Sequence, residues 1–237
     1  MIIDLREYSK EVVGYTRTAK SLVERASQSA LEKVALDLET GQDTQDHFYW
    51  NTPKAIRTIE TRDYDRAGQS APPVYVEWGF RAEFTRQPAP RRNAKWRIDE
   101  LTTQFKVWAA RDTTRPALVF HIDRKSPGQF GPDFHMQVSE DYTASAGPLH
   151  LAVPRFPTHC LLPTDCLDLV LSEFFQQKWL KEQSEGPINL MRSAQLTRAK
   201  LYSEAIAGMW QAKPRSTPIS ALQNFPLPSL NLSHESR

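Results

Sequence analysis

The spacing of apolar residues changes twice along the chain, and this change limits the possible folds more than any other feature. From residue 4 to about 39, apolar side chains recur in steps of three and four, the spacing of one helix face. From 74 to 156 they alternate with polar residues, as in strands with one buried face. From 164 to 212 the helical spacing returns. This order predicts an α+β fold.

The N-terminal helical stretch is too long for one straight helix in a protein of this size. Asp4 is the expected N-cap and Gly41 the expected end. A helix of about 35 residues would be about 50 Å long at about 1.5 Å per residue. The apolar stripe that starts at Leu5 loses its phase between Ala26 and Leu31. We therefore expect either a break that makes two core helices or a long helix that projects toward a partner.

Five short alternating segments between 74 and 156 predict a five-stranded, mainly antiparallel sheet. In the second segment Trp96 and Ile98 share one parity, whereas Leu101 takes the other. Such a slip by one residue indicates a β-bulge near Asp99–Glu100 or a strand that changes partners.

Two C-terminal helices are expected to cover one face of this sheet. The first has Thr164 as its N-cap, and the second runs from about 189 to 212, with Gly186 and Pro187 between them. The last stretch contains four prolines together with many apolar residues, so an extended tail that docks on its own domain or on a partner is expected. The predicted organisation is one domain, 1–212 (helical over 1–40, sheet over 74–156, helical over 164–212), and a docking tail, 213–237.

Three histidines lie on the polar side of three neighbouring alternating segments. His121 with Asp123, His135 and His150 would gather on the sheet face away from the helices. Three imidazoles and a carboxylate suit a divalent metal, and these four residues are the catalytic candidates of a metal-dependent phosphodiesterase or nuclease. Their spacing matches no recognised metal motif. The main interpretation is a solvated or partner-covered polar surface, with no metal and no other cofactor.

Basic residues concentrate around two predicted hairpin loops. Together they suggest a nucleic-acid interface in which cations meet phosphates and one tryptophan stacks on a base. The opposing interpretation is that hairpin tips are charged because they are solvated. The candidate residues are Arg86, Arg91, Arg92, Lys95, Trp96, Arg97, Arg124, Lys125 and Arg155.

Composition excludes several classes of protein. A formal net charge of +2 is close to neutral, so a nucleic-acid role would need a local patch. Cys160 and Cys166 form no disulfide framework and lack the second pair of a zinc site, so buried free thiols in a reducing compartment are expected. The N-terminus does not resemble a secretory signal, and no stretch approaches about 20 apolar residues. A cytoplasmic protein without membrane contact is expected.

Three short stretches resemble a group of small bacterial proteins that have no assigned activity. They are FHMQV at 134–138, VPRFP at 153–157 and CLDLVLSEFFQQKW at 166–179. The resemblance lies within residues 134–179 and implies a bacterial source but no mechanism.

These observations favour a non-enzymatic binding or accessory subunit of a bacterial multi-protein system. Its protein partner is either another chain or a second copy of itself. Nucleic-acid binding through the basic loops and metal-dependent hydrolysis on the histidine face are the two alternatives.

Overall fold

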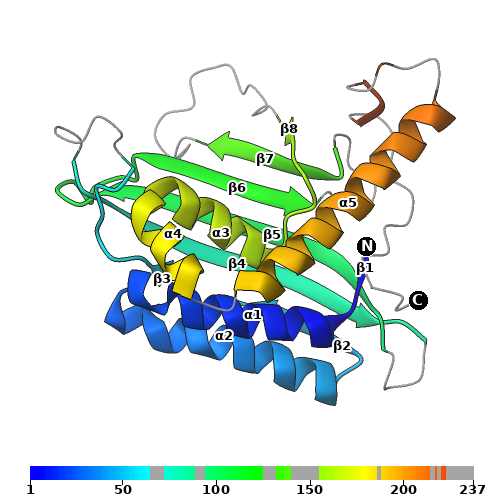
Figure 1. The fold of residues 1–237 in the computed structure, drawn as a ribbon, viewed down its shortest axis with the longest axis horizontal. Helices are drawn as coiled ribbons and strands as arrows, with labels where there is room; N and C mark the ends of the chain where they lie inside the picture. Colours follow the sequence, from blue (N-terminus) through cyan, green and yellow to red (C-terminus); the bar gives the residue numbers. More distant parts are fainter. Residues whose placement is uncertain are drawn as a thin grey trace.

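The protein has an α+β fold in which helices cover one face of an antiparallel sheet, as Figure 1 shows. The structure is a computed structural model. It describes residues 1–64, 72–88, 94–124, 132–139, 155–185, 188–213, 217 and 220–222.

The N-terminal region contains two helices, α1 (Leu5–Ala19) and α2 (Arg25–Thr44). The side chain of Asp4 accepts hydrogen bonds from the backbone N–H groups of Arg6 and Glu7 and caps α1, as predicted. A short 3₁₀ turn, η1 (Lys20–Leu22), separates the helices, which lie side by side in Figure 1. A break is therefore present and no single long helix forms, but its expected position is wrong. The helices separate at residues 20–24, whereas the phase slip between Ala26 and Leu31 lies inside α2.

The predicted end of the helical stretch at Gly41 is wrong, because α2 continues to Thr44. Gly41 has a packing role instead. A Cβ atom at this position would lie 2.6 Å from the ring of Phe48, so only glycine allows that ring to rest against the helix.

The described sheet has eight strands rather than the predicted five, in the order β2-β4-β5-β6-β7-β8, with β1 beside β5 and β3 beside β4. Three of these strands, β1, β3 and β8, contain only two residues each, which is too short to show an alternating pattern in the sequence. The fifth predicted segment, 147–155, lies almost entirely outside the described residues. The strands are β1 (Ile2–Ile3), β2 (His47–Asn51), β3 (Ile56–Arg57), β4 (Val74–Arg86), β5 (Trp96–Ala109), β6 (Leu118–Arg124), β7 (Phe134–Ser139) and β8 (Phe156–Pro157).

The predicted β-bulge is present in β5. Glu83 pairs with Glu100 and Phe84 pairs with Ile98, so Asp99 is the extra residue. As a result Ile98 and Leu101 are both buried although they differ in parity.

Over residues 155–213, apart from the two that are not described, three C-terminal helices replace the predicted two: α3 (Pro163–Phe174), α4 (Gln176–Glu185) and α5 (Ile188–Ala212). The chain leaves helical geometry at Phe175, where φ is −129°, and this residue divides α3 from α4. The N-cap of α3 is Leu162 rather than Thr164. The Asp165 side chain accepts a hydrogen bond from the Leu162 N–H at 2.9 Å, and that bond places the start of the helix earlier.

Aromatic side chains join the N-terminal helices to the sheet. Trp50 of β2 is 1% exposed, and its ring lies 5.7 Å from that of Tyr8 in α1 and 4.2 Å from that of Phe80 in β4. Its indole N–H donates to the carbonyl oxygen of Val34 in α2 at 2.8 Å. One side chain therefore contacts two helices and the sheet.

Among the described residues, no helix is long and apolar enough to cross a bilayer. Most of the expected tail, 213–237, lies outside the described residues.

Candidate functional site

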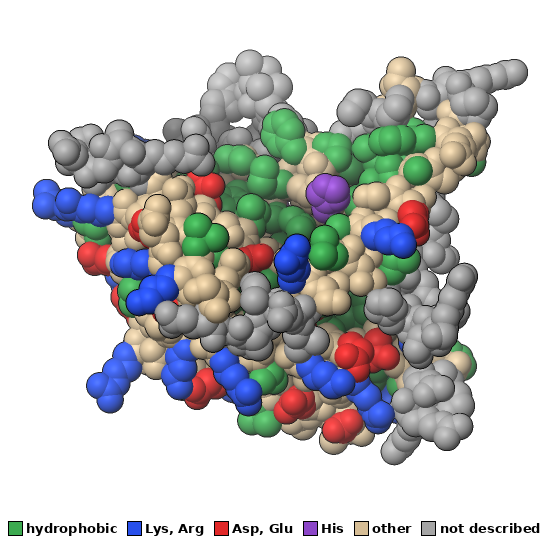
Figure 2. All heavy atoms as spheres, viewed as in Figure 1, with side chains coloured by type: hydrophobic (Ala, Val, Ile, Leu, Met, Phe, Trp, Pro, Cys, Tyr) green, Lys and Arg blue, Asp and Glu red, His purple; other side chains and the backbone are tan. Residues whose placement is uncertain are grey.

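A cleft of about 350 Å³ lies on the helical face, between α3 and α5. Figure 2 shows a hollow on this face, bordered largely by hydrophobic side chains. Its lining comes from the segment before α3 and from the two helices: His159, Cys160, Leu161, Asp165, Asp168, Leu169, Ser172, Gln195, Arg198 and Ala199.

A buried ionic network forms one side of this cleft and joins three helices. Arg198 of α5 donates to both carboxylate oxygens of Glu11 in α1, each at 2.7 Å. It also donates to Asp165 of α3 through Nη2 and, at 3.2 Å, through Nε. The three side chains are only 8%, 1% and 6% exposed. Because the guanidinium is shared between two carboxylates, the network fixes α1, α3 and α5 relative to one another.

The pKa values of the network follow from burial and pairing. Burial raises the pKa of Glu11, while the hydrogen bonds and charge of Arg198 oppose that rise. Burial acts to lower the pKa of Arg198, but Asp165 and Glu11 outweigh it and raise this pKa well above its ordinary value. The guanidinium is therefore a permanent cation here.

Asp168 is a second carboxylate in the cleft wall, and its surroundings differ. Its Oδ1 accepts hydrogen bonds from the indole N–H of Trp179 at 2.6 Å and from Gln183 at 3.1 Å. Its Oδ2 accepts from Gln195 at 2.8 Å, and the Gln195 amide also donates to the Tyr15 hydroxyl. All three donors to Asp168 are neutral. Within the described part of the chain, no cation lies within ion-pair distance of this carboxylate.

The two cysteines are buried free thiols, as predicted. Cys160 lines the cleft and Cys166 lies in the first turn of α3. Burial raises the pKa of both thiols well above the ordinary value, so neither is an activated nucleophile.

This state of the thiols predicts their reactivity. In the folded protein at about pH 8, both should react with a disulfide reagent such as Ellman's at least about 100-fold more slowly than a free thiol, because thiolate and access are both lacking. In denaturant both should react at once. Rapid modification of one thiol in the folded state would show that its surroundings open.

Part of the predicted histidine surface is assembled. His121 donates from Nε2 to the Gln137 Oε1 at 2.8 Å, and the Asp123 Oδ2 lies 3.6 Å from that Nε2 and 4.0 Å from the Nε2 of His135. His135 is only 2% exposed, which contradicts the expected solvated position. Burial lowers its pKa, and Asp123 opposes that shift, so the imidazole is held in its neutral form. His150 lies outside the described residues.

The three assembled residues do not form a metal centre. Within the described ranges, no group of three or more histidine, cysteine, aspartate or glutamate residues is arranged to hold a metal ion. His121, Asp123 and His135 form a cluster of polar side chains on the sheet, in which Asp123 lies within ion-pair distance of both histidines.

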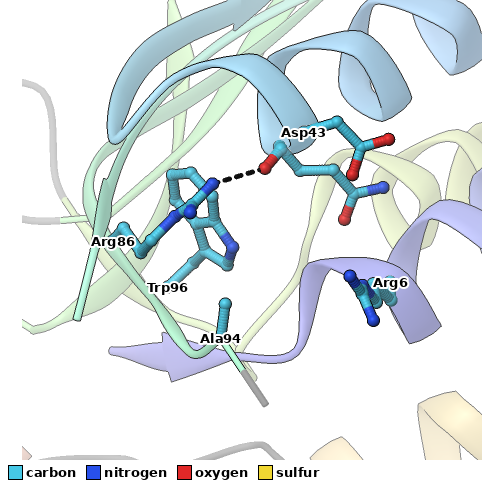
Figure 3. A pocket seen from close by; sticks show the side chains of 6 residues that line it. Arg6, Asp43, Arg86, Ala94 and Trp96 are labelled. Atoms are coloured by element: carbon cyan, nitrogen blue, oxygen red, sulfur yellow. Dashed lines mark hydrogen bonds between the residues drawn. The ribbon is translucent and has the colours of Figure 1, made fainter. Parts of the chain in front are cut away.

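Two of the predicted nucleic-acid contacts have structural roles instead. Arg86 is 12% exposed and donates to the carbonyl oxygens of Gln42 and Gln45, so it caps the C-terminal end of α2. Figure 3 shows its guanidinium beside the ring of Trp96. The guanidinium carbon lies 4.8 Å from the centroid of that ring. Trp96 is 2% exposed and packs on Phe48, so its ring is not available to stack on a base. The adjoining pocket, of about 40 Å³, has room for only a few water molecules.

The other described basic candidates are also bonded within the fold. Lys95 lies 3.8 Å from Asp4, and Arg97 pairs with Asp99. Arg124 donates to the carbonyl oxygens of Ile98 and Asp99 at 2.7 and 3.2 Å. Arg155 is half-buried just before β8. Arg91, Arg92 and Lys125 lie outside the described residues.

The cleft residues were missed by the sequence reasoning, although one signal was present. Glu11 follows Tyr8 and precedes Val12 on the apolar face of α1, and Arg198 lies on the apolar face of α5, four residues before Tyr202. A charge within an apolar helix stripe indicates a buried partner of opposite charge.

No protein-family model, curated protein or solved structure matches the chain.

Proposed function

We propose that the protein is a non-enzymatic binding or accessory subunit of a bacterial multi-protein system, and that it holds its partner in the cleft between α3 and α5. The observation that carries this proposal is a cleft with apolar walls whose deepest charges are already paired with one another. Arg198 is fully engaged by Glu11 and Asp165, so these residues shape the site and do not serve as acid, base or nucleophile.

The size and lining of the cleft support binding. A volume of about 350 Å³ lies in the range of about 300–1,000 Å³ typical of binding pockets, which are mostly apolar with a few polar groups. Leu169 is 44% exposed at this site, and contact of this apolar side chain with water is unfavourable. A partner that covers Leu169 would remove this unfavourable contact.

The state of the cysteines supports a reducing compartment for this subunit. Both thiols are free and buried, as is usual for proteins of the cytoplasm. We therefore keep the cytoplasm as the proposed location.

The experiment that tests the cleft uses a pair of matched variants on one helix. Ala199 lines the cleft, whereas Ala207 lies two turns further along α5 and is exposed outside it. Tagged wild-type, Ala199→Trp and Ala207→Trp proteins are recovered from cells of the native host, and co-purifying proteins are quantified by mass spectrometry. We expect a partner retained by wild type and Ala207→Trp but reduced about tenfold by Ala199→Trp, since an indole fills the cleft. Equal retention by both variants, or no partner for wild type, would overturn the proposal.

A further inference from the structure

We propose that the occupant of the cleft is the apolar side of an amphipathic peptide segment that also carries a basic residue, and that Asp168 receives this basic group. This inference rests on the proposed binding function and names the chemistry of the partner.

The shape of the site favours a peptide. The cleft runs between α3, of 12 residues, and α5, of 25 residues, with Leu161, Leu169 and Ala199 in its walls. Two helices that flank an apolar groove are a common arrangement for binding an amphipathic helix. The apolar walls would contact the leucine-type side chains of such a segment.

The charges of the site indicate that the bound peptide carries a positive charge. Of the lining residues, Asp165 and Asp168 are acidic and Arg198 is basic, and the charge of Arg198 is already shared between Asp165 and Glu11. Asp168 has three neutral hydrogen-bond donors and no ion-pair partner among the described residues. A lysine or arginine brought close to Asp168 would gain a favourable interaction in a partly desolvated site. A carboxylate or phosphate would be repelled, which disfavours acidic peptides, nucleotides and fatty acids.

The test uses two designed peptides of about 14 residues, or about four helical turns, with the same leucine positions. One carries lysine and the other glutamate on its polar face. Each is labelled with fluorescein and titrated with the full-length protein, and anisotropy reports the affinity. We expect the leucine–lysine peptide to bind about tenfold more tightly or better. The whole chain has a formal net charge of +2, so its overall charge favours the glutamate peptide. A preference for the lysine peptide would therefore come from the local charge of the cleft.

Variants assign the preference to the cleft. Asp168→Asn should reduce the preference for lysine several-fold, Ala199→Trp should abolish binding, and Ala207→Trp should leave it unchanged. Added salt should weaken the binding of the lysine peptide more than the binding of the glutamate peptide. This second measurement does not depend on a variant.

The outcomes separate this inference from the proposed function. If the glutamate peptide binds as tightly as the lysine peptide or more tightly, then Asp168 does not receive a basic group. If the lysine peptide binds Ala199→Trp as tightly as wild type, then the peptide does not occupy the cleft. If neither peptide binds, the peptide inference is wrong. Loss of a native partner from Ala199→Trp would then still support the cleft as a binding site for another chemistry.

Discussion

Replacement of Arg198 by methionine should lower the free energy of unfolding at neutral pH by about 3–5 kcal/mol. Methionine matches the volume of the arginine stem, so the loss is mainly electrostatic. The substitution leaves Glu11 and Asp165 buried without a cation, and an uncompensated buried charge is strongly unfavourable. Urea or guanidinium denaturation of both proteins, followed by tryptophan fluorescence, measures the difference.

The pH dependence identifies the cause of this loss. Burial already raises the pKa of Glu11 above its ordinary 4.5, and removal of Arg198 removes the main opposition, so the pKa rises further. A carboxyl with a raised pKa in the folded state loses its stabilising contribution as pH rises from its unfolded pKa through its folded pKa. The penalty in Arg198→Met should therefore be smaller at about pH 5 than at about pH 8.

A double variant is the control for this prediction. In Arg198→Met, two buried carboxylates lack a cation. The double variant Glu11→Leu/Arg198→Met removes one of these carboxylates, so it should recover part of the lost stability. The free energy of unfolding lost by the double variant is compared with the sum of the losses in the two single variants. If the double variant loses more than this sum, the loss comes from packing and not from charge.

Replacement of Trp50 by alanine should lower the free energy of unfolding by about 3–5 kcal/mol. The large side chain is almost fully buried and contacts Tyr8 and Phe80, so its removal leaves a cavity between the helices and the sheet. The substitution also removes the indole N–H that donates to the Val34 carbonyl. Thermal and chemical denaturation measure the effect.

A conservative variant separates the two contributions of this tryptophan. Trp50→Phe keeps much of the apolar volume and loses the hydrogen bond, so it should cost clearly less than Trp50→Ala. If both variants lose the same stability, then the hydrogen bond to Val34 and not the packing dominates at this position.

The main elements of the fold could be predicted because their signals are local. Helical spacing over the first 40 residues, alternation over β4 to β7 and the slip at Asp99 all depend on residues close together in sequence. Strands β1, β3 and β8 could not be predicted, since two residues contain no period and their pairing is decided by distant partners.

The candidate site was less accessible to sequence reasoning for a related reason. Side-chain parity predicted that His121 and Asp123 share one face of the sheet, and the His121 Nε2 and Asp123 Oδ2 atoms lie 3.6 Å apart. The burial of His135 and Trp96 depends on what packs against them, which no spacing reveals. The cleft combines residues of two helices and the segment before them, and its ionic network adds Glu11 from a third helix.

The link between Glu11 and Arg198 has a consequence for synthesis of the protein on the ribosome. The two residues are 187 positions apart, so α1 emerges long before the cation that neutralises its buried acid has been translated. Until then the apolar face of α1 carries a carboxylate that favours water, and its final burial must wait for nearly the whole chain. Nascent chains that stop short of residue 198 should therefore keep α1 accessible to proteases, whereas chains that include α5 should protect it.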